Sequence, residues 1–287
     1  MARRFGVIAA HGKPEAALLA REIRDWLVAR GCDVADEEVL AQSWRDREVV
    51  IAIGGDGLIM RVAHAYPEVP ILGINVGRVG FLALVEREDW ERALTDLISD
   101  HYHVQEGPTL AVQLERNGAV IVEAWAINDV VVRAGFQLIE LELYIDGQFV
   151  NTYPGDGMIV ATPQGSTAYC MAAGGPVLTA GVHGFAVTPI CPHSPIRIAL
   201  VVPEQATIEQ VYLSDREARL IIDGDPVLAL QRGDLIRVTR GTQLFRLVIL
   251  SGTNFYEAFR SKFNFQIRPE AQPSRGNDRA ASQSRAR

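Results

Sequence analysis

Hydrophobic and polar positions in the first hundred residues alternate between two periodicities. Continuous apolar runs, typical of buried strands, are Phe5–Ala10, Val49–Ile53 and Pro70–Asn75, with a weaker candidate at Asp33–Val39. Between them, apolar residues recur at helical spacing, and the predicted helices are Pro14–Arg30, Leu58–Ala65 and Glu88–Ser99. Strands that alternate with helices form a parallel sheet covered on both faces. The pattern therefore predicts a doubly wound α/β domain that binds ligands at the carboxyl ends of its strands.

The pattern changes after about Tyr102, where helical periodicity almost disappears. Short alternating or β-branched runs follow, at Leu110–Leu114, Ala119–Ala126, Val130–Arg133, Ile139–Ile145, Met158–Ala161, Ile196–Val201, Leu220–Ile222, Leu235–Thr239 and Phe245–Ile249. Asn117-Gly118 and Asp146-Gly147 stand between such runs and predict tight hairpin turns. These features predict an all-β domain of mostly antiparallel strands, built as a β-sandwich.

Two domains are also what a chain of 287 residues is expected to form. We place the α/β domain at residues 1–104 and expect the helical stretch 254–268 to return and complete it. The β-sandwich domain is then residues 105–253. Residues 269–287 are rich in Ser, Arg, Gln and Pro and almost lack apolar side chains, which predicts a disordered tail.

A glycine-rich turn follows the predicted strand Val49–Ile53. Gly54, Gly55 and Gly57 carry no Cβ, so their backbone N–H groups can closely approach a polyphosphate. Asp56 stands among them, and an acid that faces an anionic ligand is repelled unless it binds a bridging cation or accepts a proton from a hydroxyl. The alternative is a plain β-to-α turn in which Asp56 caps the next helix. The first interpretation makes this turn a phosphoryl-transfer site.

A second Gly-Asp-Gly turn, Gly155–Gly157, begins the densest run of turn-forming and hydroxyl residues in the chain. Thr162, Ser166 and Thr167 offer hydrogen-bond donors and acceptors to a ligand, and Tyr169 offers a planar face for a purine. A strand, a loop and a capped helix would explain the glycines and Ser166, but not two acidic Gly-Asp-Gly turns in one chain. We therefore interpret this run as a ligand site.

Two further groups of polar residues have weaker signals. Asn128-Asp129 pairs an amide with a carboxylate that could hold the two hydroxyls of a ribose, although a turn or bulge would use the same residues. His183, Cys191 and His193 form a conceivable zinc set, but their spacing matches no standard finger and a fourth ligand is not evident. We predict no protein metal site there, and expect a stiff proline-rich loop at Thr188–Pro195 that shapes a pocket or a subunit contact.

Charge and cysteine content narrow the function classes. The net charge of −7 argues against non-specific nucleic-acid binding, and an acidic protein that handles phosphates needs a divalent cation, so we expect Mg²⁺. Cys32, Cys170 and Cys191 form no Cys-x-x-Cys pair and leave an odd thiol, which fits a reducing cytoplasm. No apolar stretch approaches the length of a membrane span. The chain also lacks Gly-x-Gly-x-x-Gly, which disfavours a hydride-transfer enzyme of the Rossmann type.

Taken together, these motifs resemble those of the NAD kinases. The matching stretches are GGDG at 54–57, Asn128-Asp129, GDGMIVATPQGSTAY at 155–169, AAGGP at 172–176, TPICPHS at 188–194, and Phe255-Tyr256 near Arg260-Ser261-Lys262. They occur in the family's order over nearly the whole chain except the tail, and the 155–176 block is far more specific than GGDG. The resemblance implies phosphorylation of the adenosine ribose 2′-hydroxyl of NAD, with ATP or polyphosphate as donor, to give NADP. It also implies a homodimer or homotetramer, with an N-terminal α/β domain and a β-sandwich.

The resemblance further implies roles for individual residues. Asp56 looks like the proton acceptor for the 2′-hydroxyl, while Gly57 and Arg61 look like contacts of the dinucleotide. The other substrate-binding residues that it implies are Asn128, Asp129, Asp156, Thr167, Ala168, Tyr169, Cys170, Met171, Ala172 and Asp225. Asp156 is expected to reach a neighbouring subunit.

Four residues depart from the family's pattern, and two other functions compete with this one. Leu58 and Pro154 stand where polar and basic residues are common, and Gln164 and Asp225 replace the frequent Thr and Gln, which bears on donor preference and NAD contacts. A lipid kinase would share GGDG but would have no use for the 155–176 block. A binding module that senses a dinucleotide without turnover would use Asp56 only as a hydrogen-bond acceptor. Analysis of the reaction product separates the three.

Overall fold

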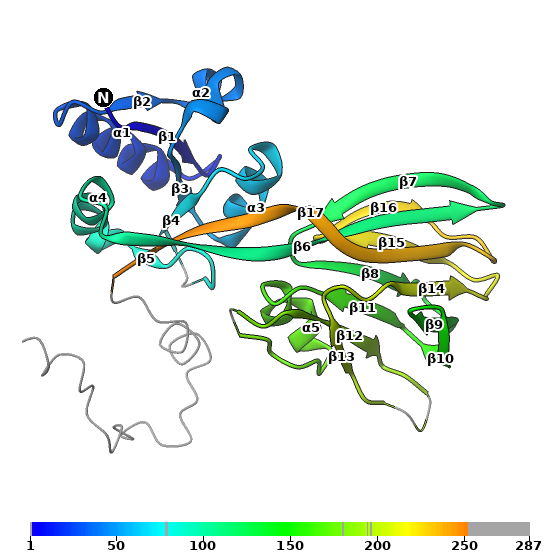
Figure 1. Ribbon diagram of the computed structural model, residues 1–287. Coiled ribbons are helices and arrows are strands. Elements are labelled where there is room, and N and C mark those ends of the chain that lie inside the picture. Colours follow the sequence, from blue (N-terminus) through cyan, green and yellow to red (C-terminus); the bar gives the residue numbers. More distant parts are fainter. Residues whose placement is uncertain (1, 78–79, 180, 194, 196, 252–287) are drawn as a thin grey trace, which may run out of the picture.

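The computed structural model describes residues 2–77, 80–179, 181–193, 195 and 197–251, and shows two lobes joined by a pair of long strands (Figure 1). The expected helix at 254–268, the expected disordered tail at 269–287 and the family motif at Phe255-Tyr256 lie outside the described residues.

The N-terminal lobe is built on a parallel sheet, as the sequence predicts. Its strands, in spatial order, are β2 (Asp33–Ala35), β1 (Arg4–Ala9), β3 (Val49–Gly54) and β4 (Ile71–Asn75), with the short β5 (Val85–Glu86) beside β4. The helices are α1 (Pro14–Val28), α2 (Glu37–Ser43), α3 (Asp56–Ala65) and α4 (Trp90–Ile98). Ile51 and Ile53 pack with α1 and α4, whereas Val50 and Ala52 pack with α2 and α3. Helices therefore cover both faces, and the doubly wound fold is confirmed.

The weak strand predicted at Asp33–Val39 is wrong in its second half. The strand ends at Ala35, and the Asp36 side chain accepts the backbone N–H of Val39, which caps α2. An aspartate that bonds to the backbone three residues ahead is a helix start signal, and here it overrides the β-branched Val39.

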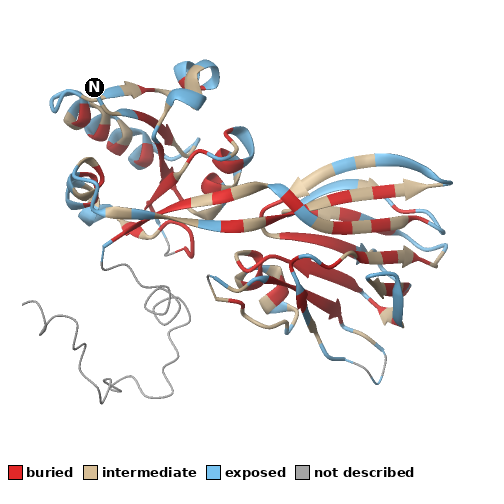
Figure 2. Cartoon of the chain, viewed as in Figure 1, coloured by how far each residue is buried: buried red, intermediate tan, exposed pale blue. Residues whose placement is uncertain are grey.

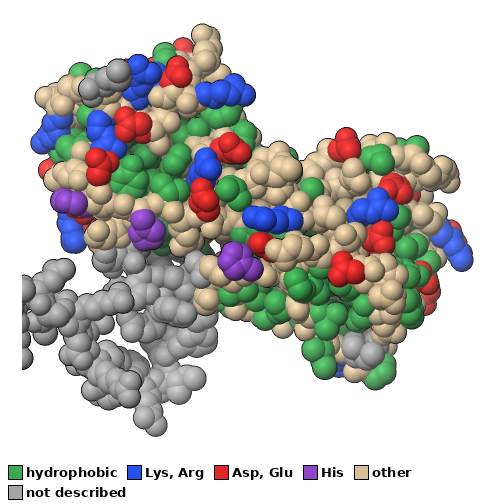
Figure 3. All heavy atoms as spheres, in the orientation of Figure 1, with side chains coloured by type: hydrophobic (Ala, Val, Ile, Leu, Met, Phe, Trp, Pro, Cys, Tyr) green, Lys and Arg blue, Asp and Glu red, His purple; other side chains and the backbone are tan. Residues whose placement is uncertain are grey.

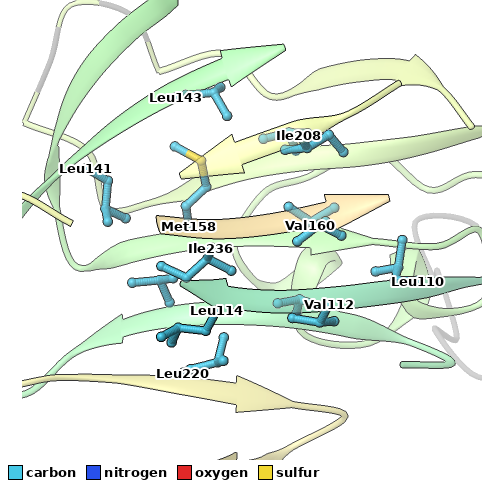
Figure 4. Close-up of a cluster of buried hydrophobic side chains, with 14 of the residues drawn as sticks. Leu110, Val112, Leu114, Leu141, Leu143, Met158, Val160, Ile208, Leu220 and Ile236 are labelled. Carbon is cyan, nitrogen blue, oxygen red and sulfur yellow. The ribbon is translucent and has the colours of Figure 1, made fainter. Parts of the chain in front are cut away.

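The C-terminal lobe is a sandwich of two sheets. One sheet contains β10 (Gln148–Gly155), β9 (Ile139–Ile145), β14 (Ile208–Tyr212), β17 (Leu235–Leu250), β6 (Tyr102–Arg116) and β7 (Ala119–Ala126). The other contains β13 (Leu200–Pro203), β12 (Gly184–Ile190), β11 (Gly157–Ala161), β8 (Asp129–Ala134), β15 (Ala218–Ile222) and β16 (Asp225–Ala229). Apolar side chains from both sheets, including Leu114, Met158 and Ile236, meet between them (Figure 4). Outside this core, the short helix α5 (Tyr169–Ala172) covers part of the second sheet.

Both predicted hairpin turns are present. Asn117 and Gly118 have φ of 52° and 78°, and Asp146 and Gly147 have φ of 50° and 73°, as tight turns of this kind require. The stiff loop expected at Thr188–Pro195 is wrong at its start. Thr188, Pro189 and Ile190 belong to β12, a strand whose seven residues are all buried in the interior of the sheet.

Two strands belong to both lobes. The long strands β6 and β17 pair from end to end except at residues 241–243, and the far end of β17 runs parallel to β4 through Leu247 and Ile71. There Phe245 and Leu247 pack against the same cluster as α3, and buried residues continue from one lobe into the other along this ribbon (Figure 2). Residues placed in the predicted second domain thus add a strand to the sheet of the first.

Gln210 is a polar residue in the core of the sandwich. It lies on β14 between Ile208 and Tyr212, and all three are 0% exposed. Neither its amide oxygen nor its amide nitrogen has a hydrogen-bond partner among the described residues. A buried amide without partners costs about 1–3 kcal/mol.

Replacing Gln210 with Met is therefore expected to raise the free energy of unfolding by about 1–3 kcal/mol, because the new side chain has similar length and no amide to desolvate. Urea unfolding of the two proteins measures the difference. The control is Gln148→Met on the exposed edge of β10, which should change stability by less than about 0.5 kcal/mol. Unchanged or lower stability of Gln210→Met would show that the amide is satisfied.

Candidate active site

Asp56 lies where strand β3 passes into helix α3. Its carboxylate accepts three backbone N–H groups from the segment after β4: Phe81 to Oδ2 at 2.8 Å, and Leu82 and Ala83 to Oδ1 at 3.0 and 3.2 Å. At Gly80 a Cβ atom would lie 1.9 Å from Asp56 Oδ1, so this segment can approach only because it has glycine there. The cap position of α3 is Gly55, without a side-chain cap, so the alternative of a capping aspartate is not what the structure shows. Asp56 is instead held at the carboxyl edge of the sheet.

The same edge brings a cation and an amide to the glycine turn. Lys13, at the start of α1, donates from Nζ to the carbonyl oxygen of Val76 at 3.2 Å. Asn75 pairs with Gly54 across β4 and β3, is 1% exposed, and has no hydrogen-bond partner for Oδ1 among the described residues. The motif analysis did not select Lys13, although its position just after the first strand places it at this edge. The site thus offers glycine backbone, a positive charge and an unpartnered oxygen.

Arg61, expected to contact the dinucleotide, lies on α3 and is 48% exposed on its side chain. Its guanidinium Nη2 is 3.8 Å from Glu37 Oε1, so it forms an exposed ion pair with α2.

The Asn128-Asp129 segment lies at the start of β8, just after β7, and is held by its backbone. Asp223 accepts the N–H groups of Ile127, Asn128 and Asp129 at 2.7, 2.7 and 3.0 Å. The Thr162 N–H donates to the Asn128 carbonyl at 2.9 Å, and a Cβ at Gly165 would lie 1.9 Å from that same oxygen. The structure therefore brings Asn128 and the loop that begins at Thr162 into direct contact. Sequence reasoning missed Asp223, whose signal is the Asp-Gly hairpin turn that it forms with Gly224.

The Thr162 and Ser166 hydroxyls form hydrogen bonds inside the protein. This corrects the expectation that they offer donors and acceptors to a ligand. Both residues are 0% exposed. Thr162 Oγ1 donates to the Ile127 carbonyl at 2.6 Å, and Ser166 Oγ donates to the Pro163 carbonyl at 2.6 Å and accepts the Leu178 N–H at 2.9 Å. A sequence shows that a hydroxyl is present, but not whether the folded backbone already uses it.

The residues that follow the loop differ in how far they are exposed to solvent. Ala168 and Ala172 are exposed, and Thr167, Tyr169 and Met171 are partly exposed. The Arg133 guanidinium lies 5.7 Å from the centre of the Tyr169 ring. The Cys170 thiol is fully buried, 3.3 Å from Thr188 Oγ1, so its side chain faces the interior.

Asp225 and Asp156 lie at different ends of the lobe. Asp225 is exposed and pairs with Ile222 across the turn of Asp223, beside the Asn128 segment. Asp156 is also exposed but precedes β11, whose opposite end carries Ala161, the partner of Asp129. A strand of five residues separates these ends by roughly 17 Å. Within one chain, the structure does not bring Asp156 to the other predicted site residues.

Asp129 is a buried carboxylate, 5% exposed. Burial, together with the negative charge of Asp223, raises the pKa of Asp129 to about 7 from its ordinary value of 3.8. Both causes disfavour the charged form.

The free energy of unfolding is expected to fall as pH rises from 3.8 to about 7, by up to about 1.4 kcal/mol per pH unit from this group. In that window the folded protein keeps the Asp129 proton that the unfolded chain has lost. Asp129→Asn removes the titration and should flatten this part of the curve, as urea unfolding across the window would measure. The exposed Asp89→Asn is the control, and an unchanged slope in Asp129→Asn would contradict the prediction.

The comparisons with known proteins agree over both lobes. Residues 39–102 match the family described as ATP-NAD kinase N-terminal domain, and residues 127–250 match the ATP-NAD kinase C-terminal domain. The NAD kinase of Thermomicrobium roseum is 80% identical over 287 residues, which is 100% of each chain. This chain belongs to the NAD kinase family. The NAD kinase of Moorella thermoacetica is 37% identical, covering 91% of this chain and 89% of that one.

Solved structures of an NADH kinase and an NAD kinase share the fold. The crystal structure of yeast NADH kinase complexed with NADH has a TM-score of 0.83 at 21% identity, covering 96% of this chain and 90% of that one. The crystal structure of an NAD kinase from Archaeoglobus fulgidus in complex with ATP has a TM-score of 0.70 at 25% identity, covering 91% and 97%. The predicted resemblance is confirmed, and the chain is a phosphotransferase that acts on an alcohol group of NAD.

On the face seen in Figure 3, Lys and Arg side chains are interspersed with Asp and Glu over both lobes, so this face carries no single basic patch. Within the described residues, no group of three or more His, Cys, Asp or Glu is placed to hold a metal ion. In the same part of the chain, no helix combines the length and the apolar character needed to cross a membrane.

Proposed function

We propose that Asp56 is the catalytic residue that accepts the proton of the adenosine ribose 2′-hydroxyl when NAD is converted to NADP. The observation that carries this proposal is the cradle of three N–H groups from residues 81–83, which fixes an acid at the glycine turn. Three hydrogen bonds from backbone N–H groups fix the direction of the Asp56 carboxylate. A base held in this way is ready to accept a proton without rearrangement.

The NAD site is proposed to lie where the two lobes meet. Asn128, Asp129 and Asp225 form one side, and Thr167, Ala168, Tyr169, Met171 and Ala172 form the other, with Cys170 supporting them from inside. The contact between Asn128 and Gly165 supports this arrangement because it joins the two sides. Asp156 is proposed to act in the site of a second copy in a homodimer or homotetramer, since it lies at the far end of β11 from Asn128.

The donor, ATP or polyphosphate, is proposed to bind at the turn of Gly54, Gly55 and Gly57, with Lys13 offsetting part of its charge. Mg²⁺ is proposed to accompany the donor. In such sites Mg²⁺ takes most ligands from phosphates and water, with one or two from the protein. Asn75 Oδ1, which has no hydrogen-bond partner among the described residues, fits that small share. The ion would supply neutralisation of the phosphate charge.

A cytoplasmic location is proposed on the evidence of the thiols. Cys32, Cys170 and Cys191 are all unpaired, as expected for a protein of a reducing compartment.

The test of the function is the identity of the product. Purified protein is incubated with Mg²⁺, NAD and either ATP or polyphosphate, and the product is analysed for NADP with phosphate on the adenosine ribose 2′-oxygen. NADP formation with one donor and not the other identifies the donor. Binding of NAD without any phosphorylated product would favour a dinucleotide sensor.

A further inference from the structure

The last turn of helix α3 contacts the other lobe. Asp56 is the first residue of this helix, and His64 lies near its end. His64 Nε2 is 2.8 Å from Oδ2 of Asp223, which is 159 residues further along the chain. Because a carboxylate can only accept, the ring nitrogen that faces it carries the hydrogen. The helix that holds the proposed base thus donates a hydrogen bond across the lobes.

The partner of His64 is the residue that holds the NAD-binding segment. Asp223 accepts the consecutive N–H groups of Ile127, Asn128 and Asp129, and its Oδ2 serves both Ile127 and His64. Its side chain is 6% exposed, whereas that of His64 is 34% exposed. A displacement of α3 would therefore be transmitted to the Asn128 backbone through one carboxylate.

Apolar contacts join the same two elements. The centre of the His64 ring is 4.3 Å from that of Trp125, with an angle of 45° between the rings. Ile127 belongs to the buried cluster that also contains Ile59 and Val62 of α3. Residues 125–129 are thus placed on α3 by side-chain packing as well as by the hydrogen bonds of Asp223.

We propose that His64 is a positioning residue, which acts through Asp223 to set Asn128 and Asp129 at the correct distance from Asp56. The proposal rests on the assignment of Asp56 as the proton acceptor. In this proposal one lobe holds the ribose hydroxyl and the other holds the base. The relative position of the two lobes therefore sets the distance over which the proton is transferred. A misplacement of about 1 Å can reduce the rate by about 100-fold.

The chain offers a matched control in a second histidine–carboxylate pair. His183 Nδ1 lies 3.3 Å from Glu204 Oε1, and the Glu204 side chain is 6% exposed, as in Asp223. This pair lies just beyond the paired ends of β12 and β13, where Gly184 is the partner of Pro203. Replacing His183 therefore removes a histidine–carboxylate bond but leaves the contact between α3 and the Asn128 segment in place.

The first test compares His64→Ala, His64→Gln and His183→Ala by steady-state kinetics, at a temperature where thermal unfolding shows all three to be folded. His64→Ala should lower kcat by about 10- to 100-fold, with a smaller change in KM for the donor. His64→Gln, whose amide can donate the same hydrogen bond, should recover most of kcat, and His183→Ala should leave kcat unchanged. A wild-type kcat in His64→Ala, or a loss that Gln does not recover, would overturn the proposal.

The second test repeats His64→Ala in an Asp56→Asn background. If His64 acts by placing the acceptor against Asp56, its removal should have little further effect once the base is gone. A full multiplicative loss would show that His64 acts independently of Asp56 and would overturn the proposal. Wild-type turnover of Asp56→Asn would overturn the Asp56 assignment and this inference with it. If Asp56→Asn strongly lowers kcat but His64→Ala keeps the wild-type kcat, the positioning role of His64 is overturned and the assignment of Asp56 stands.

Discussion

Replacing Asp56 with Asn is expected to lower kcat by about 10²–10⁴-fold while leaving most of the affinity for NAD. The change removes the proposed proton acceptor and keeps the shape of the side chain. Oδ1 can still accept the N–H groups of Leu82 and Ala83, but an amide NH₂ in the place of Oδ2 cannot accept the N–H of Phe81. One of the three backbone bonds is therefore lost with the charge.

Two measurements distinguish the loss of the proposed base from the loss of the Phe81 hydrogen bond. The dissociation constant of NAD by calorimetry shows whether the site still binds, and thermal unfolding shows whether residues 81–83 still stabilise the lobe. Asp46→Asn makes the same change in charge at an exposed position of the same lobe and should behave as wild type. Turnover of Asp56→Asn at the wild-type rate would show that Asp56 is not the base.

Removal of the divalent cation is expected to abolish turnover. Three features support this expectation: the net charge of −7, the several negative charges of a phosphate donor, and the single lysine, Lys13, that the described structure places beside the glycine turn. Excess EDTA should reduce NADP formation below detection, and addition of Mg²⁺ beyond the chelator should restore it. Binding of NAD alone should be insensitive to EDTA, which serves as the control. Full activity in excess EDTA would exclude the cation from the reaction.

The sequence predicts the fold well where one physical signal dominates. Buried parallel strands such as Val49–Ile53 need apolar residues on both faces. The hairpins at Asn117-Gly118 and Asp146-Gly147 need residues that tolerate positive φ. Both kinds of element can therefore be predicted from residue type alone. The sequence does not predict the strand β12, because Pro189 and the prolines that follow it suggest a loop. The pairing of β12 with β13 ends at Val187, so Pro189 has a strand neighbour only in β11, and no local pattern reveals this.

The candidate site could be predicted in its members but not in its contacts. Asp56, Asn128 and Asp129 follow from their places at strand ends and from the family's motifs. That the Thr162 hydroxyl bonds to Ile127, that Asp129 is buried beside Asp223, and that His64 meets Asp223 all depend on residues distant in the chain. Pairings between lobes leave no local periodicity, so only the folded structure shows them.

The continuous pair of strands between the lobes limits how this chain can change in length. Side chains alternate between faces along a strand, so one inserted residue in β17 would turn Phe245, Leu247 and Ile249 away from α3. The register is interrupted only between Arg240 and Leu244, where residues 241–243 stand opposite Thr109, whose hydroxyl donates to the Gln243 carbonyl. Insertions and deletions during evolution are therefore expected to concentrate at this irregularity, because only there can the strand gain or lose a residue without reversing the faces of one lobe.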